Sequence, residues 1–163
     1  ISFVKKQMGK KIIIGILALI ILAQLFQPSR NNGEADGPQD ITHVADVPDG
    51  VLSLLKSACY DCHSNHTSYP WYGKITPVNW WLQNHVDEGK SQLNFSIFST
   101  YSQKKMDKKL DEIIGTVKER YMPMESYVRM HSEADLSDDQ RKLITSWALQ
   151  AKQQIANRAA SVE

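Results

Sequence analysis

The chain of 163 residues has little cysteine, with Cys59 and Cys62 as its only two. No thiol is left to form a disulfide elsewhere, which excludes a disulfide framework. The region around the pair lacks the alternating strand pattern of a thioredoxin-like fold, which argues against a redox dithiol. A disulfide between the two cysteines would close too small a loop to stabilise the chain much.

Most of the chain also lacks an excess of charge of one sign. Residues 47–163 hold 14 basic and 14 acidic residues, so this part is neutral and carries no basic stripe for nucleic acid. Residues 1–26 differ, because they hold four lysines and no acid. Aromatic residues are plentiful, with four tryptophans and six tyrosines. They suit a core that wraps a large, flat, apolar ligand.

The most informative stretch is Cys59-Tyr60-Asp61-Cys62-His63, which spells C-x-x-C-H, the attachment sequence for c-type haem. Two thiols three positions apart on a helical turn lie on one side, where both can bond the vinyl groups of one haem edge. His63 then brings an imidazole under the iron as its proximal ligand. The motif therefore predicts one covalent haem c, held by Cys59, Cys62 and His63.

A zinc site is an alternative use of the same cysteines. Cys59, Cys62 and His66 would give three ligands, and His85 or His131 a fourth. Structural zinc sites usually pair two short ligand clusters, whereas this chain has one. Haem is therefore the favoured cofactor.

A second ligand for the iron is expected from the Met-Pro-Met segment that starts at Met122. A thioether is a soft, neutral ligand that favours ferrous iron and raises its potential. Pro123 fixes the local backbone, so the preceding methionine is held in one place. Met122 is the predicted distal ligand, with Met124 and His131 as alternatives. A methionine that merely fills the core would give the same pattern.

Apolar residues recur at helical spacing through residues 47–158, so this domain is predicted to be all-α. A proline or a hydroxyl cap marks each helix start. These starts are Pro48, Thr76-Pro77, Ser102 and Ser137, the last with an S-x-x-Q capping box.

The two middle helices carry residues with more than one possible role. Gly89 is the predicted C-cap of the helix that starts at Pro77. His85 lies on or beside the buried stripe of that helix, where a hydrogen-bonded core histidine is more common than an iron ligand. The polar face of the next helix is filled by Lys104, Lys105, Lys108 and Lys109. A solvated surface is favoured there over a docking patch for an acidic redox partner.

The N-terminal lysines precede an apolar run from Ile12 to Phe26. As helix this run spans about 22 Å, short of the ~30 Å hydrocarbon core, and lysine snorkelling and local thinning would cover the deficit. No small-x-small cleavage site follows Phe26, so residues 1–28 are predicted to be an uncleaved transmembrane signal anchor with a cytoplasmic N-terminus. Residues 29–46 are predicted to be a flexible tether. Residues 47–158 would then be a haem domain on the periplasmic side of a bacterial inner membrane.

Further short motifs accompany the haem sequence across about residues 47–150. They are Ser64-Asn65, Tyr69-Pro70-Trp71-Tyr72, Pro77-Val78-Asn79-Trp80-Trp81, His85-Val86 with Glu88-Gly89, Leu93-Asn94-Phe95-Ser96, Met122-Pro123, Tyr127, His131, Ala134, Leu136-Ser137 and Trp147. Together they resemble the bacterial haem-binding domain family of small monohaem cytochrome-c-like proteins. The resemblance implies an all-α cytochrome c fold with one covalent haem c, often on an N-terminal membrane anchor. It also supports Met122, at the family's Met-Pro position, as the distal ligand.

One-electron transfer is the function expected from these residues. A haem iron held by both His63 and Met122 has no open site, so the protein is expected to be an electron carrier and not an enzyme. The expected partners are redox proteins, in particular a membrane oxidoreductase complex of which the chain would be a subunit. Two alternatives remain: a peroxidase-like haem enzyme or gas sensor with an open sixth position, and a zinc-bound structural subunit.

Overall fold

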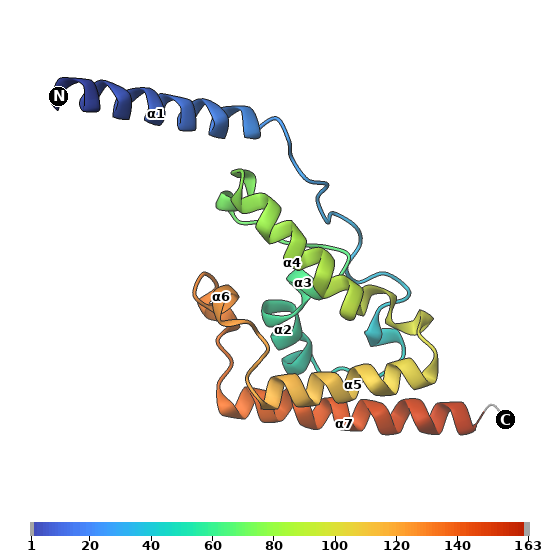
Figure 1. Ribbon diagram of the computed structural model, residues 1–163. Helices are drawn as coiled ribbons and strands as arrows, with labels where there is room; N and C mark the ends of the chain where they lie inside the picture. The colour runs from blue at the N-terminus through green and yellow to red at the C-terminus, as the bar shows by residue number, and fades with distance from the viewer. Residues whose placement is uncertain (1, 162–163) are drawn as a thin grey trace. The chain divides into compact units, whose positions relative to one another are not determined.

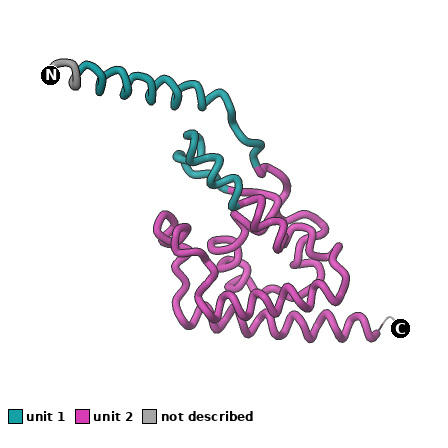
Figure 2. The backbone as a smooth tube through the Cα atoms, viewed as in Figure 1, with its two compact units in different colours: residues 1–30, 68–85 teal, residues 31–67, 86–163 magenta. Residues whose placement is uncertain are grey.

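The computed structural model describes residues 2–161, with side chains from residue 7 onward. The chain divides into two compact units, shown in Figure 2. Unit 1 comprises Ile1–Arg30 and Ser68–His85, and unit 2 comprises Asn31–Thr67 and Val86–Glu163. The regular elements of the described residues are helices, as Figure 1 shows, and extended pairing is limited to one isolated bridge. The all-α prediction is therefore confirmed.

The α-helices are α1 (Ser2–Ala23), α2 (Asp49–Ala58), α3 (Tyr60–His63), α4 (Val78–Gln92), α5 (Gln103–Lys118), α6 (Glu125–Val128) and α7 (Asp138–Ala160). The 3-10 helices are η1 (Ile41–His43), η2 (Trp71–Lys74), η3 (Phe95–Thr100) and η4 (Ser132–Ala134).

Hydroxyl caps begin the two long helices of unit 2, as the sequence predicts. The Ser102 side chain accepts a hydrogen bond from the Lys105 N–H at 3.3 Å and caps α5. In α7, the Ser137 hydroxyl accepts from the Gln140 N–H at 3.3 Å, while Gln140 Oε1 accepts from the Ser137 N–H at 2.8 Å. This capping box satisfies two backbone donors that a helix start otherwise leaves unpaired.

The core of unit 2 lies where α5 and α7 run side by side, with α2 packed on α7 (Figure 1). Trp147 of α7 is buried, and its indole Nε1–H donates to the Asp46 carbonyl at 2.9 Å. The apolar stripes of the two helices meet here, so their burial stabilises the pair. The buried residues of these stripes are Met106, Leu110, Ile113 and Val117 of α5 and Ile144, Trp147, Ala148, Ala151 and Ile155 of α7.

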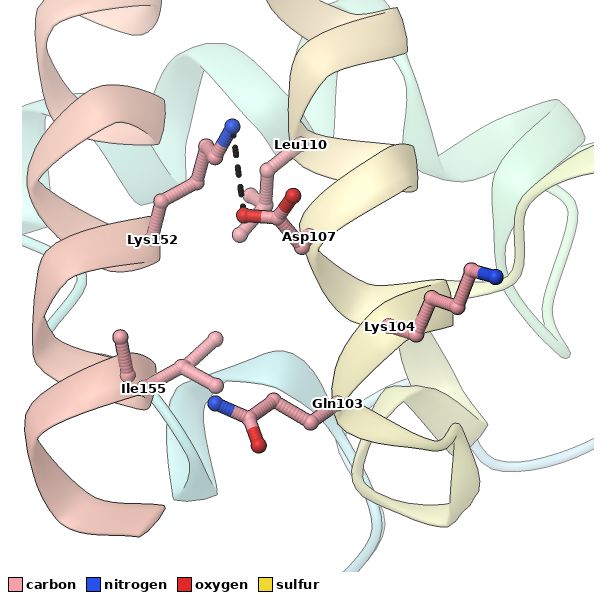
Figure 3. A pocket seen from close by; sticks show the side chains of 7 residues that line it. Gln103, Lys104, Asp107, Leu110, Lys152 and Ile155 are labelled. Atoms are coloured by element: carbon pink, nitrogen blue, oxygen red, sulfur yellow. Dashed lines mark ion pairs between the residues drawn. The ribbon is translucent and has the colours of Figure 1, made fainter. Parts of the chain in front are cut away.

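A small cavity between α5 and α7 holds an ion pair that joins the two helices, as Figure 3 shows. Lys152 of α7 lies 3.2 Å from a carboxylate oxygen of Asp107 and also pairs with Asp111, both on α5. The hydrogen bond to Asp111 is the main reason why the pKa of Lys152 is raised above its ordinary value. This ion pair is therefore explained by the packing of α7 against α5.

The segment predicted to be a flexible tether, residues 29–46, instead contributes buried residues to unit 2. Asp40 and Ile41 have no exposed surface, and Ala45 is buried. Asp40 also caps η1, because its carboxylate accepts from the Thr42 N–H at 3.0 Å. Proline, glycine and asparagine break the helical period in this segment, but a segment without a period can still be fixed by tertiary contacts.

The spacing of Val78, Trp81, Leu82, His85 and Val86 predicts a buried apolar stripe on α4, and this prediction is only partly correct. Trp81 is 54 % exposed, whereas the polar residues Asn79 and Gln83 are buried. Asn79 Nδ2 donates to Gln27 Oε1 at 2.6 Å, and Gln83 Oε1 accepts from the Tyr69 hydroxyl. Polar partners from distant parts of unit 1 therefore decide which face of the helix is buried.

The prediction of a transmembrane signal anchor in residues 1–28 is contradicted, and so is the single-pass inner-membrane location built on it. Among the helices of the described residues, none is long and apolar enough to cross a membrane. Helix α1 ends at Ala23. Its apolar part, from Ile12 onward, therefore measures about 18 Å at 1.5 Å per residue, well short of the ~30 Å of a hydrocarbon core.

Candidate functional site

One cavity of unit 2 has a volume of about 250 Å³ and is partly open to solvent. This volume lies just below the ~300–1,000 Å³ typical of small-molecule sites, and like those sites the cavity has mostly apolar walls. Its walls come from α2, α5, the segment around Leu93 and the segment that contains Met122. The lining residues are Leu55, Ala58, Cys59, His63, Gln92, Leu93, Phe95, Lys109, Glu112, Ile113, Thr116, Val117 and Met122.

Three of the four predicted haem-binding residues line this one cavity. Cys59 and His63 reach it from the C-x-x-C-H motif, and Met122 reaches it from the segment after α5. Cys62 lies between them in the motif but is not one of the lining residues, and neither is the alternative ligand Met124. The cavity therefore brings a thiol, an imidazole and a thioether together inside a largely apolar wall.

The imidazole of His63 is held by two backbone carbonyls. Its Nδ1 lies 2.9 Å from the Gly89 oxygen and 3.1 Å from the Leu93 oxygen. A carbonyl only accepts, so Nδ1 carries the proton and Nε2 is the nitrogen with a lone pair available for a metal. Burial lowers the pKa of His63 below its ordinary value, although the two carbonyls oppose the shift. The neutral ring, which is the form that binds metal, is therefore favoured.

Gly89 brings α4 into direct contact with the motif. A Cβ added at Gly89 would lie 2.7 Å from the Cys62 carbonyl oxygen and 3.0 Å from the Cys62 Cβ. The predicted C-cap role is wrong, because α4 continues to Gln92. Glycine is needed here so that two backbones can approach closely, and the same close approach supplies the carbonyl that His63 binds.

The two middle positions of C-x-x-C are also fixed by hydrogen bonds. The Tyr60 hydroxyl donates to Asp40 Oδ2 at 3.0 Å, and its ring stacks on Phe95 with the centroids 5.0 Å apart. Asp61 Oδ2 accepts from the Tyr127 hydroxyl at 2.8 Å. Burial, aided by the neighbouring carboxylates, raises the pKa of both tyrosines, so both remain donors at neutral pH. The motif is thus anchored on both sides.

We expect Tyr60→Phe to lower the free energy of unfolding by about 1.5–3 kcal/mol, because the buried Asp40 carboxylate loses a donor while the ring stacking on Phe95 remains. Urea denaturation of the purified protein measures this change. Tyr121→Phe is the matched control, since the Tyr121 side chain is 72 % exposed. Equal effects of the two substitutions would contradict the anchoring role of Tyr60.

The chemistry of the cysteines argues against the other sequence-based interpretations. Burial raises the pKa of the Cys59 thiol to about 12 and that of Cys62 to about 11. Reactive dithiols have lowered pKa values instead. Within residues 2–161, no group of three or more His, Cys, Asp and Glu side chains is placed to hold a metal ion, so the zinc site of Cys59, Cys62 and His66 is not supported.

The remaining candidate histidines each contact a residue one helical turn earlier. His85 Nδ1 donates to the Trp81 carbonyl at 2.8 Å, and the two rings lie 4.3 Å apart. His131 Nδ1 donates to the Tyr127 carbonyl at 3.1 Å and stacks on the Tyr127 ring at 4.1 Å. His131 is not among the residues that line the cavity.

Lys109 lines the cavity, although its place among the lysines of α5 predicts a solvated helix face. Its side chain is only 10 % exposed, and Nζ donates to Glu112 Oε2 at 2.6 Å. This hydrogen bond is the main reason why the pKa of Glu112 lies below its ordinary value. Helical spacing indicates that Lys109 is buried, because it lies three residues after Met106 and four before Ile113, on the apolar stripe of α5.

Comparison with known proteins gives a result consistent with this geometry. The family model described as a haem-binding domain matches residues 18–150, a range that includes the C-x-x-C-H motif and Met122. No curated protein and no solved structure matches the chain.

Proposed function

The chain belongs to the haem-binding domain family, and on this premise we propose that it is a monohaem c-type electron carrier. In this proposal Cys59 and Cys62 hold one haem through thioether bonds, His63 is the proximal ligand of the iron and Met122 is the distal ligand. When bound, the haem supplies an iron that exchanges one electron between its ferrous and ferric states.

The hydrogen bonding of His63 is the observation that carries the proposal. Because Nδ1 donates to the Gly89 and Leu93 carbonyls, the ring is oriented and Nε2 is left as the ligating nitrogen. Such a bond also makes the ligating nitrogen more basic. His63 lines the same cavity as Cys59 and Met122, so one thiol of the motif, the imidazole and a thioether meet in one place.

The cavity walls suit electron transfer more than catalysis. Apolar side chains keep water away from the bound group, which limits solvent reorganisation and affects the reduction potential. With an imidazole on one side and a thioether on the other, no position would remain open for a substrate. The apolar wall residues are Leu55, Ala58, Leu93, Phe95, Ile113 and Val117.

Visible spectroscopy of the ferric protein tests the assignment of Met122. We expect the wild-type protein to show the weak red band that reports sulfur–iron ligation and Met122→Ala to lose it. Met124→Ala is the matched control, because Met124 does not line the cavity, and it should keep the band.

Two results would contradict this assignment. One is a band that survives Met122→Ala. The other is a wild-type high-spin spectrum that changes when cyanide or peroxide is added, since that behaviour is typical of the alternative, a peroxidase-like enzyme or gas sensor with an open sixth position.

A further inference from the structure

Arg141, near the start of α7, binds three backbone carbonyls that belong to three different segments. Its Nη1 donates to the Met122 oxygen at 2.8 Å and to the Val117 oxygen at 3.0 Å, and its Nε donates to the Leu136 oxygen at 3.2 Å. Val117 and Met122 both line the cavity. One guanidinium therefore joins two parts of the cavity wall to the start of α7.

The burial of this charge indicates a specific requirement for arginine. Arg141 is 9 % exposed, and no carboxylate of residues 2–161 forms an ion pair with it. Taking a charge out of water is costly, and the hydrogen bonds to the three carbonyls, together with attraction by the Asp135 and Asp138 carboxylates, offset that cost. Such a residue is expected where its bonds fix a geometry that a neutral side chain would not fix.

The Met122 segment is also held by hydrogen bonds from its backbone N–H groups. The N–H groups of Tyr121 and Met122 both donate to the Thr116 carbonyl, at 2.9 and 3.1 Å. The Thr116 carbonyl accepts from the N–H groups of the segment, whereas the Arg141 guanidinium donates to the Met122 carbonyl. The Met122 backbone is thus held on both its donor and its acceptor side, which restricts where its side chain can reach.

We propose that Arg141 is a positioning residue that keeps the Met122 thioether at the distal side of the cavity. The inference rests on the proposed function, because it gives Arg141 a role only if Met122 is the distal ligand. It goes beyond that function because the strength of the bond between the Met122 sulfur and the iron would depend on a residue of α7. A lysine would not replace it fully, because an ammonium lacks the planar fork that donates from two nitrogens in fixed directions.

Competition by added imidazole for the sixth position of the ferric protein tests this inference. We expect Arg141→Gln to increase the affinity for imidazole by about 10- to 100-fold, because the lost bonds come from a charged donor. The red sulfur–iron band should weaken in the same variant. The imidazole affinity of Arg141→Lys should lie between those of Arg141→Gln and the wild type. The lysine variant replaces the glutamine variant in the test if the glutamine variant does not fold.

Two controls separate a positioning role from general stability. Arg129→Gln removes an arginine from α6 whose side chain is 73 % exposed, and it should leave both readouts unchanged. In a Met122→Ala background, Arg141→Gln should have no further effect on imidazole affinity, because the group that it positions is gone. A lower melting temperature with unchanged imidazole affinity and an unchanged band would overturn the inference.

The same experiment distinguishes failure of this inference from failure of the proposed function. If Met122→Ala keeps the red band, the distal assignment fails, and this inference fails with it. If Met122→Ala loses the band while Arg141→Gln and Arg141→Lys behave like Arg129→Gln, the distal assignment stands and only the role of Arg141 fails.

Discussion

Gly89→Ala is expected to lower the free energy of unfolding by about 3 kcal/mol or more and to reduce the fraction of protein that carries haem. The added Cβ would lie 2.7 Å from the Cys62 carbonyl oxygen, so one of the two backbones must move. The neighbour is a backbone atom and not the end of a flexible side chain, so the strain has no easy release. The movement would also displace the Gly89 carbonyl that accepts a hydrogen bond from the His63 Nδ1–H.

Urea denaturation and the ratio of haem to protein absorbance measure the two effects. Gly115→Ala is the matched control, because Gly115 lies inside α5 and an added Cβ would meet nothing within 4 Å. The control should gain about 0.5–1 kcal/mol, since alanine is the better helix former. A Gly89→Ala protein as stable and as rich in haem as this control would contradict the close approach of α4 to the motif.

Cys62→Ser is the substitution with the second large expected effect, and we expect it to give little folded domain. Loss of the thiol removes one of the two covalent bonds proposed to hold the haem. Several core residues face the cavity, among them Leu55, Phe95 and Val117, and without the bound group their apolar surface would meet water. A domain of this size has little apolar core to spare.

Far-ultraviolet circular dichroism and thermal melting of the variant measure its folding. The double variant Cys59→Ser with Cys62→Ser should be at least as strongly affected, because neither thioether can form. A helical protein without haem and with an unchanged melting temperature would show that the fold does not depend on the group.

Local sequence signals predicted the helices of unit 2 well. Ser102 and Ser137 cap helices where their hydroxyls predict, because capping depends on residues only a few positions apart. Membership of the haem-binding domain family is confirmed, since the family model matches residues 18–150. The choice of Met122 over Met124 agrees with the lining of the cavity, although the ligand itself remains a prediction.

The features that the sequence did not reveal depend on contacts between distant residues. Gly89 is predicted to end a helix, but the backbone of Cys62 is the reason for its glycine. Arg141 and Lys109 both lie on apolar stripes, and a charged residue at such a position indicates a buried role without naming its partners. The partners of Arg141 are backbone carbonyls, which any residue supplies and which therefore leave no trace in sequence.

The anchor prediction failed for a different reason. The prediction takes the apolar run to be helical up to Phe26, whereas α1 ends at Ala23. The three missing residues shorten the apolar helix by about 4.5 Å at ~1.5 Å per residue, which widens a deficit that the run to Phe26 already has. Helix ends are also harder to predict from sequence than helix centres.

The most direct test of the account is a haem-stained denaturing gel of the purified protein, run beside the double variant Cys59→Ser with Cys62→Ser. Only haem bonded to the chain survives denaturation. The account predicts that the stain moves with the wild-type polypeptide and is absent from the double variant. A wild-type band without stain, from protein that carried haem before denaturation, would contradict covalent attachment through Cys59 and Cys62.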